Sequence, residues 1–476
     1  MATMTLEYFV LFFLLTGSLS AGKVFAVVPP ATEQISTLER AVGLARAHRY
    51  AEAEAIMRGV RPPADRQQRI VFYRLKSAIA SGLGHSTSAA ENMEAASRLL
   101  PDNQDLHLAA DLARLQAEVE TQVNPVLSLK HLRSAELPPQ RKIEIRLHAA
   151  EILSRAGLYA EALTDFEEAS RLAPNRADLF FDQALALFRL GKLEAALATA
   201  MQAKTLEDSA SLESLMGDIQ EKRGDALAAV QSYQAAVTLE PSEERHRVAL
   251  ALELIRHQTF DAALIVLNQA TNLFPQSVRL KILQSLTYYF VDRSTDAIHV
   301  LLEATEMDTH NETAARYLGE ITLQDAAAPD PTAVAQVCKF ADERSKSKSA
   351  DAFCGGILLR LARDSGETKR KMEIFRRLQH AVRVAPGESI ARCQLGQAFE
   401  WAGQWREARP QMEACVRLDS DAPEGHYHLS RIYRRLGMTE LANQQTLLQQ
   451  QAAQRQSEES VRRTKTVTKF LVQLEP

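Results

Sequence analysis

The chain has 476 residues, of which 46% are hydrophobic and 24% charged, and these values are typical of a folded protein rather than a disordered one. Its formal net charge of -4 gives it no overall basic excess of the kind by which nucleic-acid-binding proteins attract phosphate. We therefore expect a folded protein that binds no nucleic acid.

The first residues have the pattern of a targeting segment. The apolar run from Tyr8 to Leu15 is too short to span a bilayer, and the small residues TGSLSAG follow it. The segment before the run has no Lys or Arg and contains Glu7, which departs from an ordinary secretory signal. We predict that residues 1–26 are a signal peptide and that the protein is exported, periplasmic or secreted. The alternative is that residues 8–28 remain as a membrane anchor.

Residues 34–142 carry a faint pattern of helical hairpins. The stretch HRYAEAEAIM places Tyr50 and Ala53 beside a turn, and GHSTSAAENMEAASRLLP places Gly84 at another turn with a closing Pro101. A further helix begins near Pro125. We predict divergent hairpin repeats over this range.

Residues 143–311 repeat one pattern at nearly constant spacing. Turn residues recur at steps of 34, 33, 34 and 34 residues, at Gly157, Gly191, Gly224, Gln258 and Asp292. Five residues after each turn lies an alanine: Ala162, Ala196, Ala229, Ala263 and Ala297. Seven residues further lies another: Ala169, Ala203, Ala236, Ala270 and Ala304. This spacing predicts regular repeats across the whole range.

Each repeated position has a physical reason. Glycine tolerates the positive φ of a tight turn between helices, small residues let two helix axes approach closely, and Pro174, Pro241 and Pro275 cannot continue the preceding helix. One hairpin cannot bury its apolar stripe alone, so neighbouring hairpins must stack.

The remaining chain continues the pattern less evenly. The stretches LQDAAAPDPTAV and RDSGETKRKM indicate divergent repeats with lengthened turns over 312–388, and any domain division is expected near 325–349. Clear repeats return over 389–456. Residues 457–476 are expected to form an irregular or strand-like tail after a glutamine-rich capping helix.

These repeats resemble the tetratricopeptide repeat. Counting from Ile143, the chain supplies the residues that the family favours, although its position 4, where the family favours Trp, is Arg146. The matching residues are Ala149, Ala150, Leu153, Gly157, Tyr159, Ala162, Phe166, Ala169 and Pro174. A second clear copy begins at Ser389. The resemblance implies an all-α fold, a right-handed superhelical α-solenoid of about twelve stacked helix-turn-helix repeats.

The sequence gives no support for an enzyme. The repeats leave no stretch long enough for a separate catalytic domain, and the motifs HExxH, GxxxxGK[ST], GxGxxG, GxSxG and CxxC are absent. His426 and His428 are spaced poorly for a shared metal, so we predict structural histidines, no metal and no cofactor. Cys338 and Cys354 either pair, as export would allow, or are buried as small apolar residues. Asn311 lies in a sequon at a helix start, where capping is the favoured interpretation.

The resemblance also implies a binding surface. In the family the first helix of each repeat lines the concave face, and unit positions 2, 5, 9, 12 and 13 tend to face the ligand. The partner-facing residues predicted in this way are Leu147, Phe181, Leu185, Phe188, Val248, Leu252, Ile255, Ile282, Leu286, Tyr289, Phe290, Trp401, Tyr427, Arg431, Arg434 and Arg435. The alternative is that the aliphatic members pack as core. The Lys and Asn pair of the family's carboxylate clamp is absent from these positions.

The predicted function is an exported, non-enzymatic scaffold or adaptor that binds protein or peptide segments on its concave face, with no small-molecule substrate. The aromatic and arginine residues favour a partner that carries carboxylates. The alternative is a repeat regulator or assembly factor of an envelope complex, attached to the membrane by a retained N-terminal segment.

Overall fold

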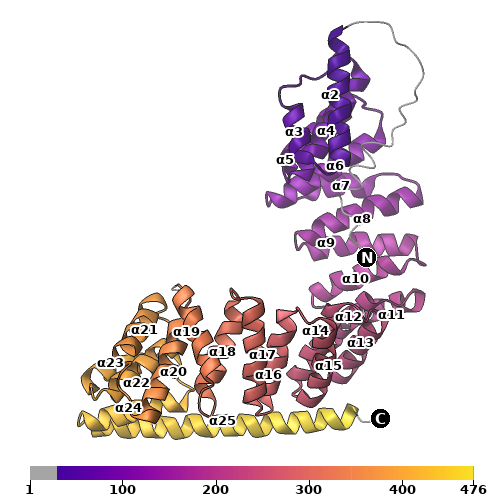
Figure 1. Ribbon diagram of the computed structural model, residues 1–476. Helices are drawn as coiled ribbons and strands as arrows, with labels where there is room; N and C mark the ends of the chain where they lie inside the picture. The colour runs from indigo at the N-terminus through magenta and orange to yellow at the C-terminus, as the bar shows by residue number, and fades with distance from the viewer. Residues whose placement is uncertain (1–28, 345, 475–476) are drawn as a thin grey trace. The chain divides into compact units, whose positions relative to one another are not determined.

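The structure is a computed structural model that describes the backbone of residues 29–344 and 346–474, and the side chains of residues 36–344 and 346–458. Across these residues it contains 24 α-helices and no strand (Figure 1). The helices form hairpins that stack in chain order, so the predicted α-solenoid is confirmed. The predicted signal segment lies outside the described residues.

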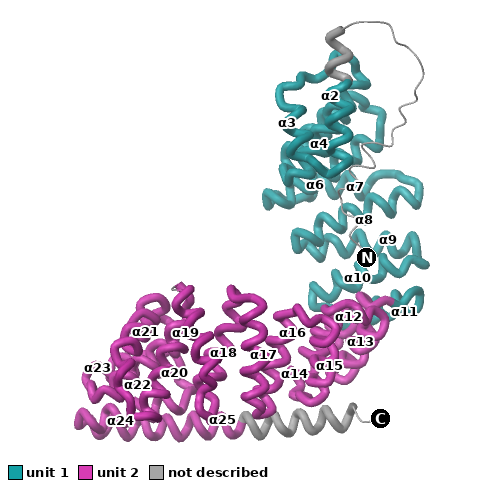
Figure 2. Tube along the Cα trace, viewed as in Figure 1, with its two compact units in different colours: residues 1–208 teal, residues 209–476 magenta. Residues whose placement is uncertain are grey.

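The helices group into two compact units, one ending at Asp208 and the other beginning at Ser209 (Figure 2). This division differs from the one near 325–349 that the long turns favour. Unit 1 consists of α2 (Pro29–Arg46), α3 (Tyr50–Met57), α4 (Arg66–Gly82), α5 (Ser86–Arg98), α6 (Gln104–Glu120), α7 (Val126–Ser134), α8 (Pro139–Arg155), α9 (Tyr159–Leu172), α10 (Ala177–Arg189) and α11 (Leu193–Leu206).

Unit 2 continues the same alternation of first and second helices. It consists of α12 (Ala210–Arg223), α13 (Ala226–Leu239), α14 (Glu244–Arg256), α15 (Phe260–Leu273), α16 (Val278–Phe290), α17 (Ser294–Met307), α18 (Glu312–Gln324), α19 (Pro331–Glu343), α20 (Ala350–Ser365), α21 (Lys371–Val384), α22 (Ser389–Trp401), α23 (Trp405–Leu418), α24 (Pro423–Arg435) and α25 (Thr439–Leu474). Among these, α18 has the predicted N-cap residue: the side chain of Asn311 accepts a hydrogen bond from the Ala314 N–H. No helix in the described part of the chain is long and apolar enough to cross a bilayer.

The repeated small residues lie where the helices of a hairpin touch. All ten alanines of the regular repeats, from Ala162 to Ala304, are 0% exposed. Gly217 serves the same purpose in α12, because a Cβ added there would lie 2.6 Å from the ring of Tyr233 on α13. Close approach of the helix axes therefore explains why these positions stay small.

The turn positions adopt the left-handed conformation expected of them. Gly157, Gly191 and Gly224 have φ between 72° and 79°, and Gln258 and Asp292, which replace glycine in the next two repeats, have φ of 58°. A side chain in this region costs about 1–2 kcal/mol. The repeat geometry thus overrides the preference of these two residues.

Replacing Gln258 by glycine is expected to stabilise unit 2 by about 0.5–1 kcal/mol, because relief of the strained backbone exceeds the extra chain entropy of glycine. Thermal unfolding followed by circular dichroism measures the change. The matched control is Gly224→Gln, which should destabilise by a similar amount. A lower melting temperature for Gln258→Gly would contradict the prediction.

The end of the chain differs from the expected tail. The backbone stays helical to Leu474, so α25 includes most of residues 457–476. Its first half packs on α24 through the buried Ala442 and Ala452, and Arg455 forms an ion pair with Asp421 at 2.9 Å. The glutamine-rich part is thus the solvated cover of the last hairpin.

The cysteines form two disulfides in unit 2. Cys338 on α19 pairs with Cys354 on α20, which decides between the two alternatives left open by the sequence. Cys393 on α22 pairs with Cys415 on α23, a pairing that the sequence analysis did not predict. Each bond joins two adjacent helices of the stack.

Candidate functional site: a pocket among the helices of unit 1

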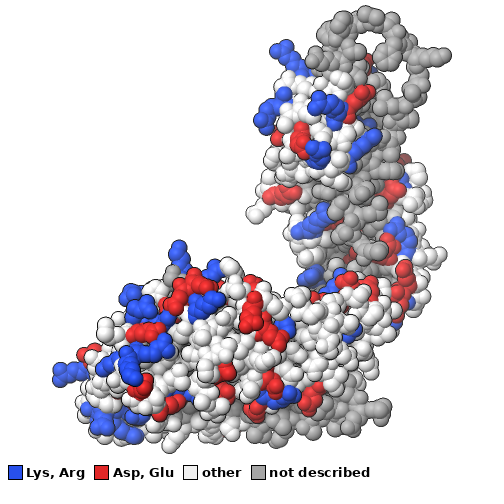
Figure 3. Space-filling model, viewed as in Figure 1, with Lys and Arg blue, Asp and Glu red and all other residues white. Residues whose placement is uncertain are grey.

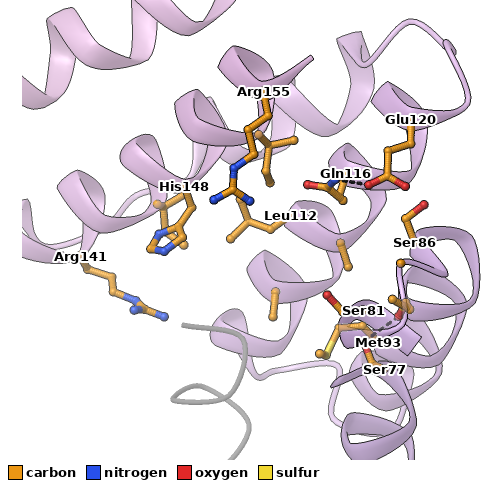
Figure 4. Close-up of a pocket in the computed structure, with 16 residues that line it drawn as sticks. Ser77, Ser81, Ser86, Met93, Leu112, Gln116, Glu120, Arg141, His148 and Arg155 are labelled. Atoms are coloured by element: carbon orange, nitrogen blue, oxygen red, sulfur yellow. Dashed lines mark hydrogen bonds between the residues drawn. The ribbon is translucent and has the colours of Figure 1, made fainter. Parts of the chain in front are cut away.

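A pocket of about 180 Å³ lies among α4, α5, α6 and α8 (Figure 4). Most of its wall is apolar, with Met93 from α5, Leu112 from α6, and Ile145 and Ile152 from α8. An apolar cavity of about 150 Å³ holds a benzene molecule. The pocket of unit 1 therefore has room for one large apolar side chain.

Local signals in the sequence set the helices that form this pocket. Asp65 caps α4 by accepting from the Gln68 N–H, Asn103 caps α6 by accepting from the Leu106 N–H, and Pro139 starts α8 at a position where its missing N–H costs nothing. Between them α7 has only nine residues, and α6 contacts α8 directly. These signals place α4, α6 and α8, which together with α5 line the pocket.

Cationic groups from α8 line one side of the pocket (Figure 4). The Arg155 side chain is exposed and makes no ion pair or hydrogen bond within the described part of the chain. Arg141 also lines the pocket but is engaged by Glu144 at 2.7 Å and Asp105 at 3.0 Å. Arg155 is therefore the cation best placed to receive an anionic or carbonyl group.

Hydrogen-bond acceptors from α6 line the other side. Gln116 donates its amide Nε2–H to Glu120, and its Oε1 atom is buried with no hydrogen-bond partner among the described residues. A buried acceptor without a donor costs about 1–3 kcal/mol. A ligand N–H at this point would remove that cost.

Burial lowers the pKa of His148, which also lines the pocket, so its ring is neutral at pH 7. The ring donates Nδ1–H to the Glu144 carbonyl at 2.6 Å. The pocket thus combines an apolar wall with a donor side at Arg155 and acceptors at Gln116 and Glu120.

None of the sixteen residues predicted to face a partner lines this pocket. In unit 1 Leu147, Phe181, Leu185 and Phe188 are half-buried, and Leu147 packs against a core cluster around Ala169. In unit 2 the half-buried residues of the same prediction are Leu252, Ile255, Ile282, Leu286, Tyr289 and Trp401. The structure does not bring these residues together into one pocket.

Two predicted residues of unit 2 have distinct surroundings. Val248 is 2% exposed and belongs to a core cluster with Leu267 and Leu280, so it is not available to a partner. Phe290 is 52% exposed and stacks on Phe260, with 5.3 Å between the ring centroids. The prediction for Val248 is wrong, because this side chain packs against α15 and α16 rather than facing outward.

A model of the tetratricopeptide repeat family matches residues 147–208 and 393–454. The chain is a tetratricopeptide-repeat protein. No curated protein matches this sequence.

The C-terminal part of a tetratricopeptide-repeat protein from Cytophaga hutchinsonii is 15% identical, with a TM-score of 0.45 over 52% of this chain and 99% of that one. Yeast Tom70 is 15% identical, with a TM-score of 0.35 over 87% of this chain and 96% of that one. The Cut9–Hcn1 hetero-tetramer of the APC/C is 11% identical, with a TM-score of 0.35 over 84% of each chain. These likenesses concern the fold alone.

The predicted C-terminal residues of this tetratricopeptide-repeat protein are already engaged within unit 2. The guanidinium of Arg431 lies 5.6 Å from the Tyr427 ring centroid and its Nε lies 3.2 Å from Glu400, which is buried. Arg434 donates to Thr446. In the same part of the fold Arg435 lies over the ring of Trp405, and Trp401 faces Lys371. A carboxylate partner would have to compete with these contacts.

His426 and His428 have structural partners, as predicted. His426 contacts Gln445 and the Ser420 carbonyl, and His428 Nδ1 lies 2.6 Å from Glu400 Oε2. Burial disfavours the charged form of His428, but hydrogen bonds to Glu400 and Glu424 outweigh it and raise its pKa. The described residues contain no group of three or more side chains suited to a metal ion.

Two carboxyl groups beyond the pocket lie on neighbouring first helices of the tetratricopeptide repeats. Burial, followed by the charges of Glu151 and Asp178, raises the pKa of Asp182 on α10 to about 7. Burial also raises the pKa of Glu151 on α8, whose Oε2 has no hydrogen-bond partner. Ionising this pair therefore opposes folding.

Replacing Asp182 by asparagine is expected to stabilise unit 1 above pH 7 by an amount on the order of 2 kcal/mol. A carboxyl whose folded pKa of about 7 exceeds its ordinary value of 3.8 destabilises the fold increasingly from pH 3.8 to pH 7, and by a constant amount above pH 7. Urea unfolding of both proteins at pH 5 and pH 8 measures the difference. An equal effect at the two pH values would contradict this assignment.

Proposed function

We propose that this chain is an exported, non-enzymatic scaffold that binds a segment of a partner protein along its first helices, and takes neither nucleic acid nor a small-molecule substrate. The tetratricopeptide-repeat fold is in general a protein-interaction scaffold. The observation that carries the proposal is the pocket of unit 1, which has room for one apolar side chain and offers hydrogen-bonding groups on opposite sides.

The pocket suits a peptide residue. Its apolar side chain would lie against Met93 and Ile152, its N–H would donate to the buried Oε1 of Gln116, and a carbonyl or carboxylate oxygen would accept from Arg155. Each of these peptide groups is the complement of a group in the pocket wall: an apolar surface, an acceptor or a donor. A neutral His148 adds no cost of charge burial.

Export is supported by the two disulfides, since such bonds persist in oxidising compartments and are rare in the cytosol. The alternative remains a membrane-anchored regulator or assembly factor of an envelope complex, held by residues 8–28. Membrane association that resists carbonate extraction, in protein that still contains these residues, would favour the anchored form.

Crosslinking capture from the native envelope tests the pocket. Ala113→Phe fills the pocket and Arg155→Glu reverses its exposed cation, so both should lose the partner that the parent chain captures. The control is Lys192→Glu, which reverses an exposed cation of unit 1 in the turn before the second helix α11 and should capture as the parent does. Undiminished capture by both pocket variants would refute the proposed site.

A further inference from the structure

A second surface with binding features lies on unit 2, around α21. An open groove of about 510 Å³ runs beside α21 and the end of α22. Its floor is made by Phe375 and Phe399, whose ring centroids are 5.1 Å apart. Met372, at its edge, is 87% exposed. An apolar side chain so fully exposed beside an aromatic floor marks a candidate contact surface.

The groove is lined by cations and by no carboxylate. Lys371, Arg376 and Arg383 line it, and none of them makes an ion pair or a side-chain hydrogen bond within the described part of the chain. Figure 3 shows Lys and Arg side chains gathered over the part of unit 2 that contains α21 and α23. The local field at the groove is therefore positive, although the whole chain has a net charge of -4.

The opposite face of α21 explains why these cations form no ion pair within the described part of the chain, although Lys371 also lies 6.0 Å from the centroid of the Trp401 ring. Arg377 is buried and pairs with Asp342 at 2.8 Å, Asp351 at 3.0 Å and Glu373 at 3.2 Å. Arg370 also binds Glu373. Asp342, Asp351 and Glu373 are thus engaged by Arg377 and Arg370, and none of them forms an ion pair with the three groove cations within the described part of the chain.

We propose that this groove binds an acidic segment of a partner protein that carries an aromatic or aliphatic anchor residue. The anchor contacts Phe375, Phe399 and Met372, and the acidic residues pair with the cations along α21. Lys371 and Arg383 are twelve residues apart, which is about 18 Å along a helix and matches roughly five or six residues of extended peptide. This site is independent of the unit 1 pocket.

A protein segment fits the groove better than a membrane surface does. A hollow with an aromatic floor accepts a side chain that projects from a backbone, whereas an anionic bilayer presents a broad surface. The three cations also lie in a line along one helix, which matches acidic residues placed along an extended peptide. Anionic vesicles are therefore the competing ligand in the test.

The test uses the full chain and synthetic peptides followed by fluorescence anisotropy. The probe is a short peptide of Asp and Glu with Phe anchors, and its companions replace Phe by Ser or the acidic residues by Lys. The groove variant combines Lys371→Glu, Arg376→Glu and Arg383→Glu. The matched control combines Lys222→Glu, Lys348→Glu and Arg279→Glu, which changes three exposed cations elsewhere in unit 2.

We expect saturable binding of the acidic Phe peptide that weakens about tenfold or more in the groove variant, stays at the parent level in the control, and falls with added salt. Neither companion peptide should bind as tightly as the acidic Phe peptide, and phosphatidylglycerol vesicles should not displace that peptide. No binding, equal binding to the groove variant, or vesicle binding that displaces the peptide would each overturn the proposal. Met372→Gln leaves every charge in place and should by itself weaken the binding of the acidic Phe peptide.

Discussion

Replacing Asp165 by alanine is expected to lower the free energy of unfolding by about 3–5 kcal/mol. This side chain on α9 is 0% exposed and accepts from two guanidinium groups: Arg146 Nη1 at 2.5 Å, and Arg133 Nε and Nη2 at 3.1 and 2.7 Å. Without the carboxylate, Arg146 keeps its charge in a site that is only 8% exposed. Urea unfolding of the full chain, followed by circular dichroism, measures the loss.

A control on the same helix separates the buried ion pair from helix propensity. Glu161 is exposed on α9, so Glu161→Ala should change stability by no more than about 0.5 kcal/mol. A double change, Arg146→Leu with Asp165→Leu, removes both charges and should recover much of the loss, because apolar packing replaces buried pairs at little cost. Equal effects of the Asp165 and Glu161 changes would show that the pair contributes nothing.

Asp165 also illustrates what the sequence can and cannot predict. The family favours Trp where this chain has Arg146, and the sequence offers no reason for the change. In the structure Arg146 of α8 reaches across to α9 and bridges to Arg133 of α7 through Asp165. A charged contact among three helices thus stands where the family favours an aromatic side chain. It depends on the Arg146–Asp165 and Arg133–Asp165 contacts, whose residues are 19 and 32 positions apart in the sequence.

The regular part of the fold follows from local signals and was predictable. In the regular repeats four first helices begin 14 residues before a predicted turn residue, at 177, 210, 244 and 278, and α22 begins at Ser389, where the second clear copy was predicted. Small residues, turns and closing prolines fix this register within each hairpin. Even the non-glycine turn at Asp292 adopts the predicted geometry.

The candidate site follows from an irregularity, which a repeat pattern does not describe. The pocket is lined by α4, α5, α6 and α8 of the divergent repeats, and the packing of these helices is not set by the repeat pattern. Ile145, His148 and Ile152 occupy unit positions that the family does not assign to ligands. Arg155 is the exception, since it falls at position 13 of its repeat, and that signal was available in the sequence.

The Cys393–Cys415 bond also had a signal in the sequence. Cys415 stands 26 residues after Ser389, the place held in regular repeats by a fully buried alanine such as Ala169, which faces the first helix of its own hairpin. A cysteine at that place is therefore directed toward α22, where Cys393 lies. Spacing alone could not show this, because the pairing follows from how the two helices pack.

Removing either disulfide is expected to destabilise unit 2 by about 3 kcal/mol. The bonds join residues 16 and 22 positions apart, and loops of these lengths differ little in closure entropy, so Cys338→Ala with Cys354→Ala and Cys393→Ala with Cys415→Ala should have similar effects. Removal of both pairs should lower stability by roughly 6 kcal/mol if the two effects add. Urea unfolding of each variant, with and without reductant, measures these losses.

Reductant provides the internal control, because it should destabilise the parent chain as much as removal of both pairs does and leave the variant without cysteines unchanged. Thiol titration of the denatured, unreduced chain should find no free thiol, since the structure contains no unpaired cysteine. Four reactive thiols would contradict both bonds. In protein isolated from its native source, oxidised pairs would also support the proposed export, because a chain that folded and stayed in the reducing cytosol would keep its thiols.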